Sequence, residues 1–374
     1  MSREIRGDTD RFREGMELLA GGVRERAYQA AVLLAARGEE ILLHGSAGEA
    51  RLSSIFDISS LTKPLVASLF YILVQQGKLT PDGKVSEILP ARSPDPAFQR
   101  ITFLHLLSHT AGLPSYRHFY SELREAGEKE GRNLWGTAEG HDRIVDAVLS
   151  LSLESPPGTA WAYSDPGYIL LGRAIEAASF TTLDRLLRKE LAAPLGMRDT
   201  SYLPLSAVSE CETGRLMSTG HSEERGTEKV GEVDDENAAA MGGVAGHAGI
   251  FSSAYDLYLF AREILRARRG GGRVLNRRSA GEMTARVPEP PGCPRTPGWD
   301  TPTSAEGGGS QAGSRFSVET IGHLGWTGCS LWIDLPREVT VVLLANRVYY
   351  GQDNERLKGL RPRIHDAVME AAER

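Results

Sequence analysis

Two side chains three residues apart, Ser60 and Lys63, provide the strongest chemical signal in the sequence. The apolar run at 65–76 that follows them predicts a buried helix ending near Gly77. Because residues three apart lie on one face of a helix, the Lys63 amine is expected to reach the Ser60 oxygen. A serine hydroxyl is a weak nucleophile that needs an adjacent base, and the free N–H groups at a helix start favour an oxyanion. The pair therefore predicts Ser60 as a nucleophile and Lys63 as its proton partner.

A simpler interpretation of the same residues stays open. Ser60 can serve as a helix N-cap, with Lys63 exposed in the first turn and doing no chemistry. Lysine is slightly disfavoured at that end of a helix by the helix dipole, which counts against this alternative. Pro64 fits either interpretation, because a proline is tolerated in the first turn of a helix and not later.

A second candidate element is residues 161–168 (WAYSDPGY). Asp165 followed by Pro166 predicts an N-cap with proline at the first helical position, opening a helix over 166–178. Tyr163 is a candidate proton carrier if the Lys63 cation lowers the pKa of its phenol. The alternative for Tyr163 is an aromatic ring packed under the turn.

A third candidate element is residues 322–328 (GHLGWTG). In a regular strand His323 and Gly325 point to the same face, and a glycine there leaves room for close approach of substrate or backbone. The backbone N–H of Trp326 is then a candidate oxyanion donor. The alternative for His323 is a structural histidine. We interpret His109, at a helix end, as structural, and the isolated His247 predicts no metal site.

The elements that must position these residues are strands at both ends of the chain and helices in the middle. Two β-hairpins are predicted, one from 29–36 and 40–45, the other from 320–334 and 339–346. The fold class is therefore α+β: an antiparallel sheet built from both chain ends, flanked by helices, with an inserted helical lobe. The predicted helices are 8–20, 101–108, 142–151, 167–178, 183–193, 253–267 and 354–372, and 301–315 is a Gly/Ser-rich loop expected to be mobile.

Composition narrows the classes of function for the 374 residues. A net charge of −6 argues against a general affinity for nucleic acid, which needs a basic face. No stretch approaches the roughly 20 apolar residues of a membrane span. The charged first 20 residues have no signal-like apolar core, and the three cysteines form no C-x-x-C pair, so we expect a cytoplasmic protein. We expect a small-molecule or peptide substrate, and no cofactor or metal.

The three elements together resemble the serine β-lactamases and penicillin-binding proteins, whose signatures are S-x-x-K, Y-x-N and K-T-G. Their order is most similar to the branch of class C β-lactamases, D-Ala-D-Ala peptidases and esterases. Residues 103–114 (FLHLLSHTAGLP) and 246–260 (GHAGIFSSAYDLYLF) also resemble that branch, so the resemblance covers about 50 to 346. Residues 233–249 and 298–302 look similar to members that act on peptidoglycan peptides and muropeptide amides.

The resemblance implies a role for each matching residue. Ser60 would be acylated, with Lys63 and Tyr163 moving its proton, and the backbone N–H groups of Ser60 and Trp326 would form the oxyanion hole beside Gly325. It also implies one catalytic domain over 1–374. The α/β lobe would comprise about 1–75 and 270–374, the helical lobe would comprise about 76–269, and the site would lie between them.

Two departures from the family pattern affect the chemistry. Asp165 replaces the asparagine of Y-x-N, and a carboxylate beside Lys63 favours the ammonium, which shifts the work of a base to Tyr163. His323 and Leu324 replace the lysine and threonine of K-T-G, so the permanent cation for a substrate carboxylate is missing and efficient penicillin hydrolysis is not expected.

Three functions remain open from the sequence. The leading hypothesis is hydrolysis of a small amide or ester, such as a peptidoglycan-derived peptide, through a Ser60 acyl-enzyme. The second is a plain carboxylesterase. The third is a catalytically idle protein that binds a ligand or a partner, which would form no Ser60 adduct.

Overall fold

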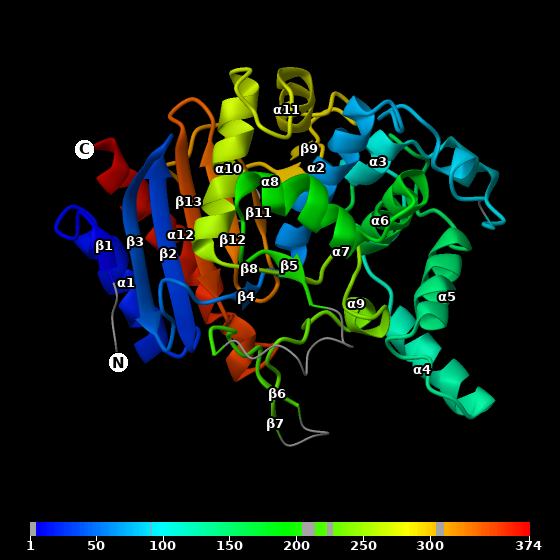
Figure 1. The fold of residues 1–374 in the computed structure, drawn as a ribbon, viewed down its shortest axis with the longest axis horizontal. Helices are drawn as coiled ribbons and strands as arrows, with labels where there is room; N and C mark the ends of the chain where they lie inside the picture. The colour runs from blue at the N-terminus through cyan, green and yellow to red at the C-terminus, as the bar shows by residue number, and fades with distance from the viewer. Residues whose placement is uncertain (1–4, 91, 204–213, 223–226, 304–309) are drawn as a thin grey trace.

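A computed structural model of the chain describes residues 5–90, 92–203, 214–222, 227–303 and 310–374 (Figure 1). Within them, an antiparallel sheet has the strand order β1-β3-β2-β13-β12-β11-β10-β9. The two ends of the chain meet where β2 pairs with β13, from Ala31 opposite Ala345 to Arg37 opposite Val339. The strands are β1 (Ile5–Gly7), β2 (Ala30–Arg37), β3 (Glu40–Gly48), β9 (Arg295–Thr296), β10 (Trp299–Asp300), β11 (Ile321–Leu324), β12 (Ser330–Asp334) and β13 (Val339–Ala345).

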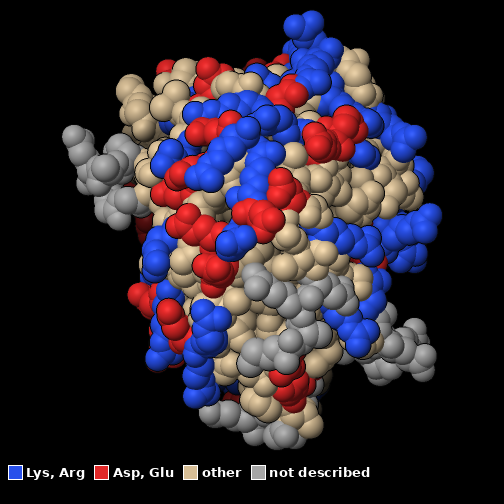
Figure 2. Space-filling model, turned by 90° about the vertical axis from the view of Figure 1, so that its left-hand side faces the viewer, with Lys and Arg blue, Asp and Glu red and all other residues tan. Residues whose placement is uncertain are grey.

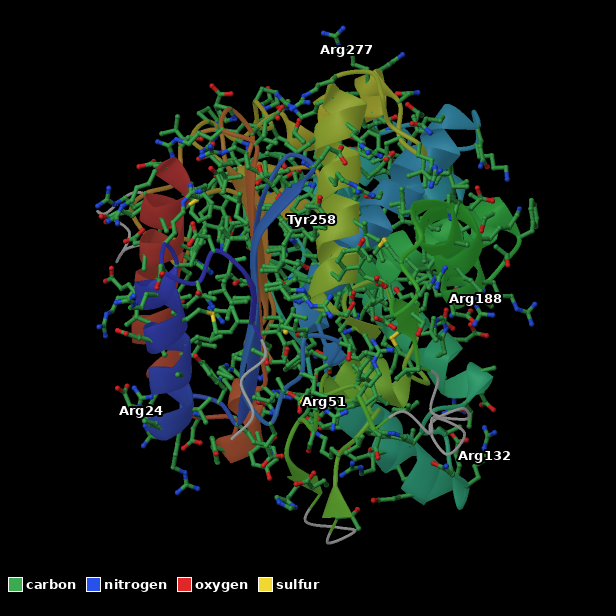
Figure 3. All side chains as sticks on the ribbon, turned by 60° about the vertical axis from the view of Figure 1, so that its left-hand side comes forward. Arg24, Arg51, Arg132, Arg188, Tyr258 and Arg277 are labelled. Carbon is green, nitrogen blue, oxygen red and sulfur yellow. The ribbon has the colours of Figure 1, made fainter. Side chains whose placement is uncertain are left out.

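Helices cover both faces of this sheet, and each face has its own apolar core. The alternation of side chains along a strand sends Leu33 to the core under α1 (Arg13–Arg24) and α12 (Arg356–Glu373), and Leu34 to the opposite core. Figure 3 shows α1 and α12 on one side of the sheet and α10 on the other. The antiparallel sheet built from both chain ends is therefore confirmed.

Helix α10 (Ala254–Arg268) packs on β2 and β13, although it falls in the part of the sequence that we assigned to the helical lobe. Tyr258 of α10, labelled in Figure 3, donates to the Glu39 carbonyl at 2.9 Å in the turn that joins β2 to β3. Helix α2 (Thr62–Gln75) packs between α11 (Arg277–Thr284) and α6 (Asp165–Ser179). The helical layer over this face of the sheet thus includes α10, which comes from the part of the sequence (76–269) that we assigned to the helical lobe.

The middle of the chain is mostly helical, as predicted, and its helices between about residues 100 and 180 lie beyond α2 from the sheet (Figure 1). A small sheet of order β4-β8-β5 joins the segment before α2 to the segment before α10, and a short β6–β7 hairpin lies apart from it. The other helices and strands of the described residues include α3 (Phe103–Leu107), α4 (Phe119–Glu130), α5 (Ala138–Leu149), α7 (Leu183–Leu186), a π-helical turn (Leu187–Ala192), α8 (Ala193–Leu195), α9 (Glu236–Ala240), β4 (Phe56–Asp57), β5 (Ser201–Tyr202), β6 (His221–Ser222), β7 (Thr227–Glu228), β8 (Ile250–Ser252) and 3₁₀ turns at Ser59–Leu61, Val85–Glu87, Pro96–Arg100 and Arg347–Tyr350.

Several predicted boundaries were wrong. The first helix begins at Arg13 and not at residue 8, because the Asp8 carboxylate accepts the Arg11 N–H and closes a turn before it. The predicted strand 320–334 is two strands, β11 and β12, separated by a turn in which the Gly325 N–H donates to the Cys329 carbonyl at 2.7 Å. Of the predicted mobile loop 301–315, residues 304–309 lie outside the described part of the chain.

The surface carries both signs of charge. Figure 2 shows basic and acidic side chains interspersed on the face drawn there. Among the described residues, no helix combines the length and the apolar character that a bilayer span requires. In the same ranges, no three or more His, Cys, Asp or Glu side chains group in a way that could hold a metal ion.

Candidate active site

The element that presents Ser60 is a 3₁₀ turn, Ser59–Leu61, which runs directly into the first turn of α2 at Thr62. Helix α2 is buried along nearly its whole length, whereas Ser60 itself is partly exposed. The helix begins three residues earlier than the apolar run predicted. The hydroxyl of Ser60 therefore stands at the positive end of a buried helix, where substrate can reach it.

Lys63 lies on the first turn of α2 and is completely buried. Its Nζ lies 3.0 Å from Ser60 Oγ, 3.0 Å from the His247 carbonyl oxygen and 2.8 Å from Asp165 Oδ1. An ammonium has three N–H donors and no acceptor. Its contacts with Ser60 and His247 are hydrogen bonds, and its contact with Asp165 is an ion pair. The geometry thus fits a charged lysine that donates to Ser60 and takes nothing from it.

The pKa of Lys63 also favours the charged form of the side chain. Burial alone lowers the pKa of Lys63, but the Asp165 carboxylate and the Tyr163 phenol outweigh it and raise that pKa above its ordinary value. The exposed-lysine alternative is wrong, because the side chain has no contact with solvent.

The predicted capping role of Asp165 is also wrong. The N-cap of α6 is Ser164, whose Oγ accepts the Gly167 N–H at 3.2 Å, and Asp165 is the first helical residue with Pro166 second. Its carboxylate, partly exposed, is therefore free to turn toward Lys63. Because the helix begins one residue earlier than predicted, Asp165 does not cap it and instead forms the ion pair with the buried Lys63.

Tyr163 precedes α6 and lies over the same lysine, with Lys63 Nζ 4.8 Å from the centroid of its ring. Burial raises the pKa of Tyr163, while Lys63 and a side-chain hydrogen bond to Ser60 act to lower it. Tyr163 therefore interacts with both Ser60 and Lys63, and the three side chains make up one interacting group.

His109 positions Tyr163. It has a left-handed backbone (φ 59°), and its Nδ1 accepts the Ser164 N–H at 3.0 Å. Its ring packs against those of Tyr163 and Tyr168, tilted by 38° and 36°, at centroid distances of 4.6 and 5.0 Å. These contacts agree with a structural role for His109, which holds the segment that carries the candidate proton carrier.

His323 lies on β11, buried, with its ring centroid 6.0 Å from that of Tyr163. Its Nδ1 lies 2.9 Å from the Leu324 carbonyl oxygen, which assigns the hydrogen to Nδ1, and Nε2 has no partner among the described residues. Burial, and then the charges of Lys63 and Arg295, lower the pKa of His323 well below its usual range. The side chain is a neutral acceptor.

Arg295, on β9, is a residue of this site that we did not predict. It is 8% exposed, and its guanidinium carbon lies 5.7 Å from the Trp161 ring and 5.5 Å from the Tyr163 ring. Its ion pair with Asp300 is long, at 3.4 Å, and its Nε has no hydrogen-bond partner in the described ranges. A cation with unused donor capacity thus stands beside the candidate catalytic group.

Gly325 and Trp326 lie where the turn after β11 passes the nucleophile segment. A Cβ on Gly325 would come within 2.6 Å of the Ile58 carbonyl oxygen, so only glycine allows this close approach. The Trp326 N–H donates to Ser59 Oγ at 3.2 Å, next to Ser60. The Trp326 indole is 56% exposed, with the Arg347 guanidinium 4.4 Å from its ring.

His247, for which the sequence predicted no metal site, takes part in the candidate active site through its backbone carbonyl. Its carbonyl accepts from Lys63, and its ring Nε2 lies 2.9 Å from Asp235 Oδ1. Asp235 also caps α9 by accepting the Ala238 N–H. The glycine-rich run 242–249 lets this backbone pass α6 closely, since a Cβ on Gly246 would meet the Tyr168 carbonyl oxygen at 2.0 Å. No sequence signal marks a carbonyl as a ligand.

The chain matches the family model "Beta-lactamase" over residues 9–364. It is 31% identical over 338 residues to "N-acetylmuramyl-L-alanine amidase" of Bacillus subtilis, covering 83% of this chain and 71% of that protein. It is 29% identical to "Putative D-alanyl-D-alanine carboxypeptidase" of Salmonella typhi, covering 83% and 73%. In fold it is similar to a "putative beta-lactamase" of Bacteroides dorei, with a TM-score of 0.68 at 17% identity over 99% of this chain and 100% of that one. The match over nearly the whole chain confirms the resemblance: this chain belongs to the β-lactamase family.

Proposed function

We propose that the protein hydrolyses a small amide or ester by transferring its acyl group to Ser60 and then to water. The observation that carries this proposal is the contact of 3.0 Å between Ser60 Oγ and Lys63 Nζ at the start of α2, with Tyr163 over the same lysine. In the first step Ser60 Oγ bonds to the carbonyl carbon, and Tyr163 takes the hydroxyl proton and passes it to the leaving amine or alcohol. In the second step the oxygen of a water molecule bonds to the carbonyl carbon of the Ser60 ester, and Tyr163 takes a proton from that water. The bond to Ser60 Oγ then breaks, Tyr163 returns the proton to Ser60, and the acid leaves.

Tyr163 is the base in this scheme, because the Asp165 carboxylate lies 2.8 Å from Lys63 Nζ and favours the ammonium form of the lysine. The lysine stabilises the phenolate that forms when Tyr163 gives up its own proton. The pKa of Tyr163 lies above its ordinary value, because the phenol is buried. Little phenolate is therefore present at neutral pH, and its fraction grows in alkaline solution. We therefore expect kcat/KM to increase from neutral into alkaline solution.

Asp165→Asn is expected to move this rise to lower pH by on the order of one pH unit. The carboxylate raises the pKa of Lys63 and that of Tyr163, so its loss lowers both, and the base is deprotonated at a lower pH. The pH dependence of kcat/KM measures the shift, with thermal unfolding as a check on the fold. Glu14→Gln, which removes a charge from the first turn of α1, is the matched control. An unchanged profile would leave Asp165 a helix residue without a role in proton transfer.

We further propose a substrate whose leaving group carries a carboxylate. The two relatives are named for N-acetylmuramyl-L-alanine and for D-alanyl-D-alanine, and in both compounds alanine departs with its own carboxylate. His323 is neutral here and offers no charge to such a group. Arg295 supports the proposal, because its guanidinium lies beside Tyr163 and its ion pair with Asp300 leaves donors unused.

Arg295→Met is expected to raise KM roughly 10- to 100-fold for a substrate with this carboxylate, the value of one charge-assisted hydrogen bond. The same peptide with a terminal carboxamide should show no change, and neither should a neutral nitrophenyl ester. Arg277→Met, on the exposed start of α11, is the matched control.

The screen that separates the candidate functions compares N-acetylmuramyl-L-alanine, an acyl-D-alanyl-D-alanine peptide and nitrophenyl esters side by side. Turnover of the first or second compound supports the proposal. Turnover of neutral esters alone, unaffected by Arg295→Met, would instead identify a carboxylesterase. Binding of any of these compounds without turnover would indicate a protein that binds its ligand and catalyses no reaction.

A further inference from the structure

The backbone N–H of Trp326 has a hydrogen-bond acceptor within the protein. It donates to Ser59 Oγ at 3.2 Å, and Ser59 is the residue directly before the candidate nucleophile. This N–H is the one that the family pattern assigns to the oxyanion of the reaction. A substrate oxygen that needs it must therefore displace the Ser59 hydroxyl first, an inference that rests on the proposed function.

The hydroxyl of Ser59 is held in this place by its backbone. Ser59 has a left-handed conformation (φ 49°), which is uncommon for a residue other than glycine. Its N–H donates to Asp57 Oδ1 at 2.8 Å, and the other carboxylate oxygen of Asp57 accepts the Asp234 N–H at 2.7 Å. Asp57 is buried, so this anchor is not exchanged for water.

The donor side of the contact is fixed as well. The Thr327 hydroxyl donates to the Asp57 carbonyl at 2.8 Å, and the Arg347 Nε donates to the Trp326 carbonyl at 2.8 Å. The loop that carries the Trp326 N–H is thus tied to the strand before Ser59 and to the segment after β13. Rotation of the Ser59 side chain about its Cα–Cβ bond is the movement that frees the N–H without moving either backbone.

We propose that the Ser59 hydroxyl is a resident ligand of the oxyanion donor, which it releases only when a substrate carbonyl oxygen takes the Trp326 N–H. In each turnover the Trp326 N–H then gives up its hydrogen bond to Ser59 before it binds the substrate oxygen. Without the Ser59 hydroxyl, the N–H would bind the substrate oxygen at no such cost. Ser59 is a positioning residue in this scheme: it restrains acyl transfer by the free energy of the hydrogen bond that each substrate must displace.

The test uses an arylboronic acid, which bonds to a serine oxygen and places an anionic oxygen where the tetrahedral intermediate would have one. Ser59→Ala and Ser59→Gly should each bind it about three- to tenfold more tightly than the wild type, the value of one neutral hydrogen bond. The rate of acylation by a nitrophenyl ester should rise by a similar factor. Ser68→Ala, a buried serine of α2 that donates to the Pro64 carbonyl, is the matched control and should bind as the wild type does.

The two variants separate the hydroxyl from the backbone, because both lack the hydroxyl and only glycine relaxes the left-handed conformation. Tighter binding in Ser59→Gly alone would overturn the proposal and assign the effect to backbone strain. Unchanged or weaker binding in both variants would overturn it as well, the weaker case showing that the hydroxyl assists the oxyanion. Ser60→Ala reports on the proposed function separately: if it binds the boronic acid as the wild type does, Ser60 is not the nucleophile, whatever the Ser59 variants show.

Discussion

Ser60→Ala is expected to lower kcat by about 10⁴- to 10⁶-fold on any substrate that the wild-type protein hydrolyses. The substitution removes the only atom that can form the acyl bond in the proposed mechanism. It leaves the helix start, the oxyanion donors and the Lys63–Asp165 ion pair in place, so substrate binding should persist with little change in affinity. The fold should persist as well, because Ser60 is partly exposed and caps no helix.

A fluorophosphonate probe makes this result specific to one atom. Mass spectrometry of the labelled wild-type protein should find a single adduct on the peptide that contains Ser60, and Ser60→Ala should show none. Ser68→Ala, on the same helix, should be labelled at the wild-type rate. An adduct on another serine, or full activity in Ser60→Ala, would overturn the assignment.

Tyr163→Phe is expected to lower kcat by roughly 10²- to 10⁴-fold with a small change in KM. Phenylalanine keeps the ring that packs against His109 and lies over Lys63, so the site should stay assembled. What it removes is the oxygen that receives the Ser60 proton. The increase of kcat/KM toward alkaline pH should disappear with it, because that increase follows the deprotonation of the phenol.

Tyr168→Phe is the matched control for this prediction. Tyr168 is also buried against His109, but its hydroxyl donates to the Leu107 carbonyl at 3.0 Å, away from Ser60. Its loss should cost stability and little activity. If Tyr163→Phe instead kept both its rate and its pH profile, another group would have to serve as the base.

How much of the site can be predicted from the sequence depends on how local each interaction is. Ser60 and Lys63 are one helical turn apart, so their spacing alone brings the two atoms together once the helix is identified. Asp165 shows the limit of this reasoning. Its neighbour Ser164 and Asp165 itself are both good caps, and the choice between them depends on contacts of Ser164 with the Pro114 carbonyl and with His109.

Arg295 and Ser59 could not be predicted, for different reasons. Arg295 stands in an irregular stretch among 36 arginines, and only the pairing of β9 with β10 brings it to Tyr163. The hydrogen bond of Ser59 to Trp326 depends on one positive φ angle at a residue type that rarely adopts one. The overall sheet was easier to predict, since β2, β3, β12 and β13 lie in apolar runs that are separated by short polar turns.

The pairing of β2 with β13 determines how late in synthesis the central sheet can be completed. Arg37 pairs with Val339, so one edge of the first hairpin has no partner until the ribosome has made the chain as far as β13. An unpaired apolar edge invites association with other nascent chains, and contacts this distant in sequence form slowly. The strand that carries His323 is made late too, so a growing chain that already contains Ser60 and Lys63 still lacks part of the site around them.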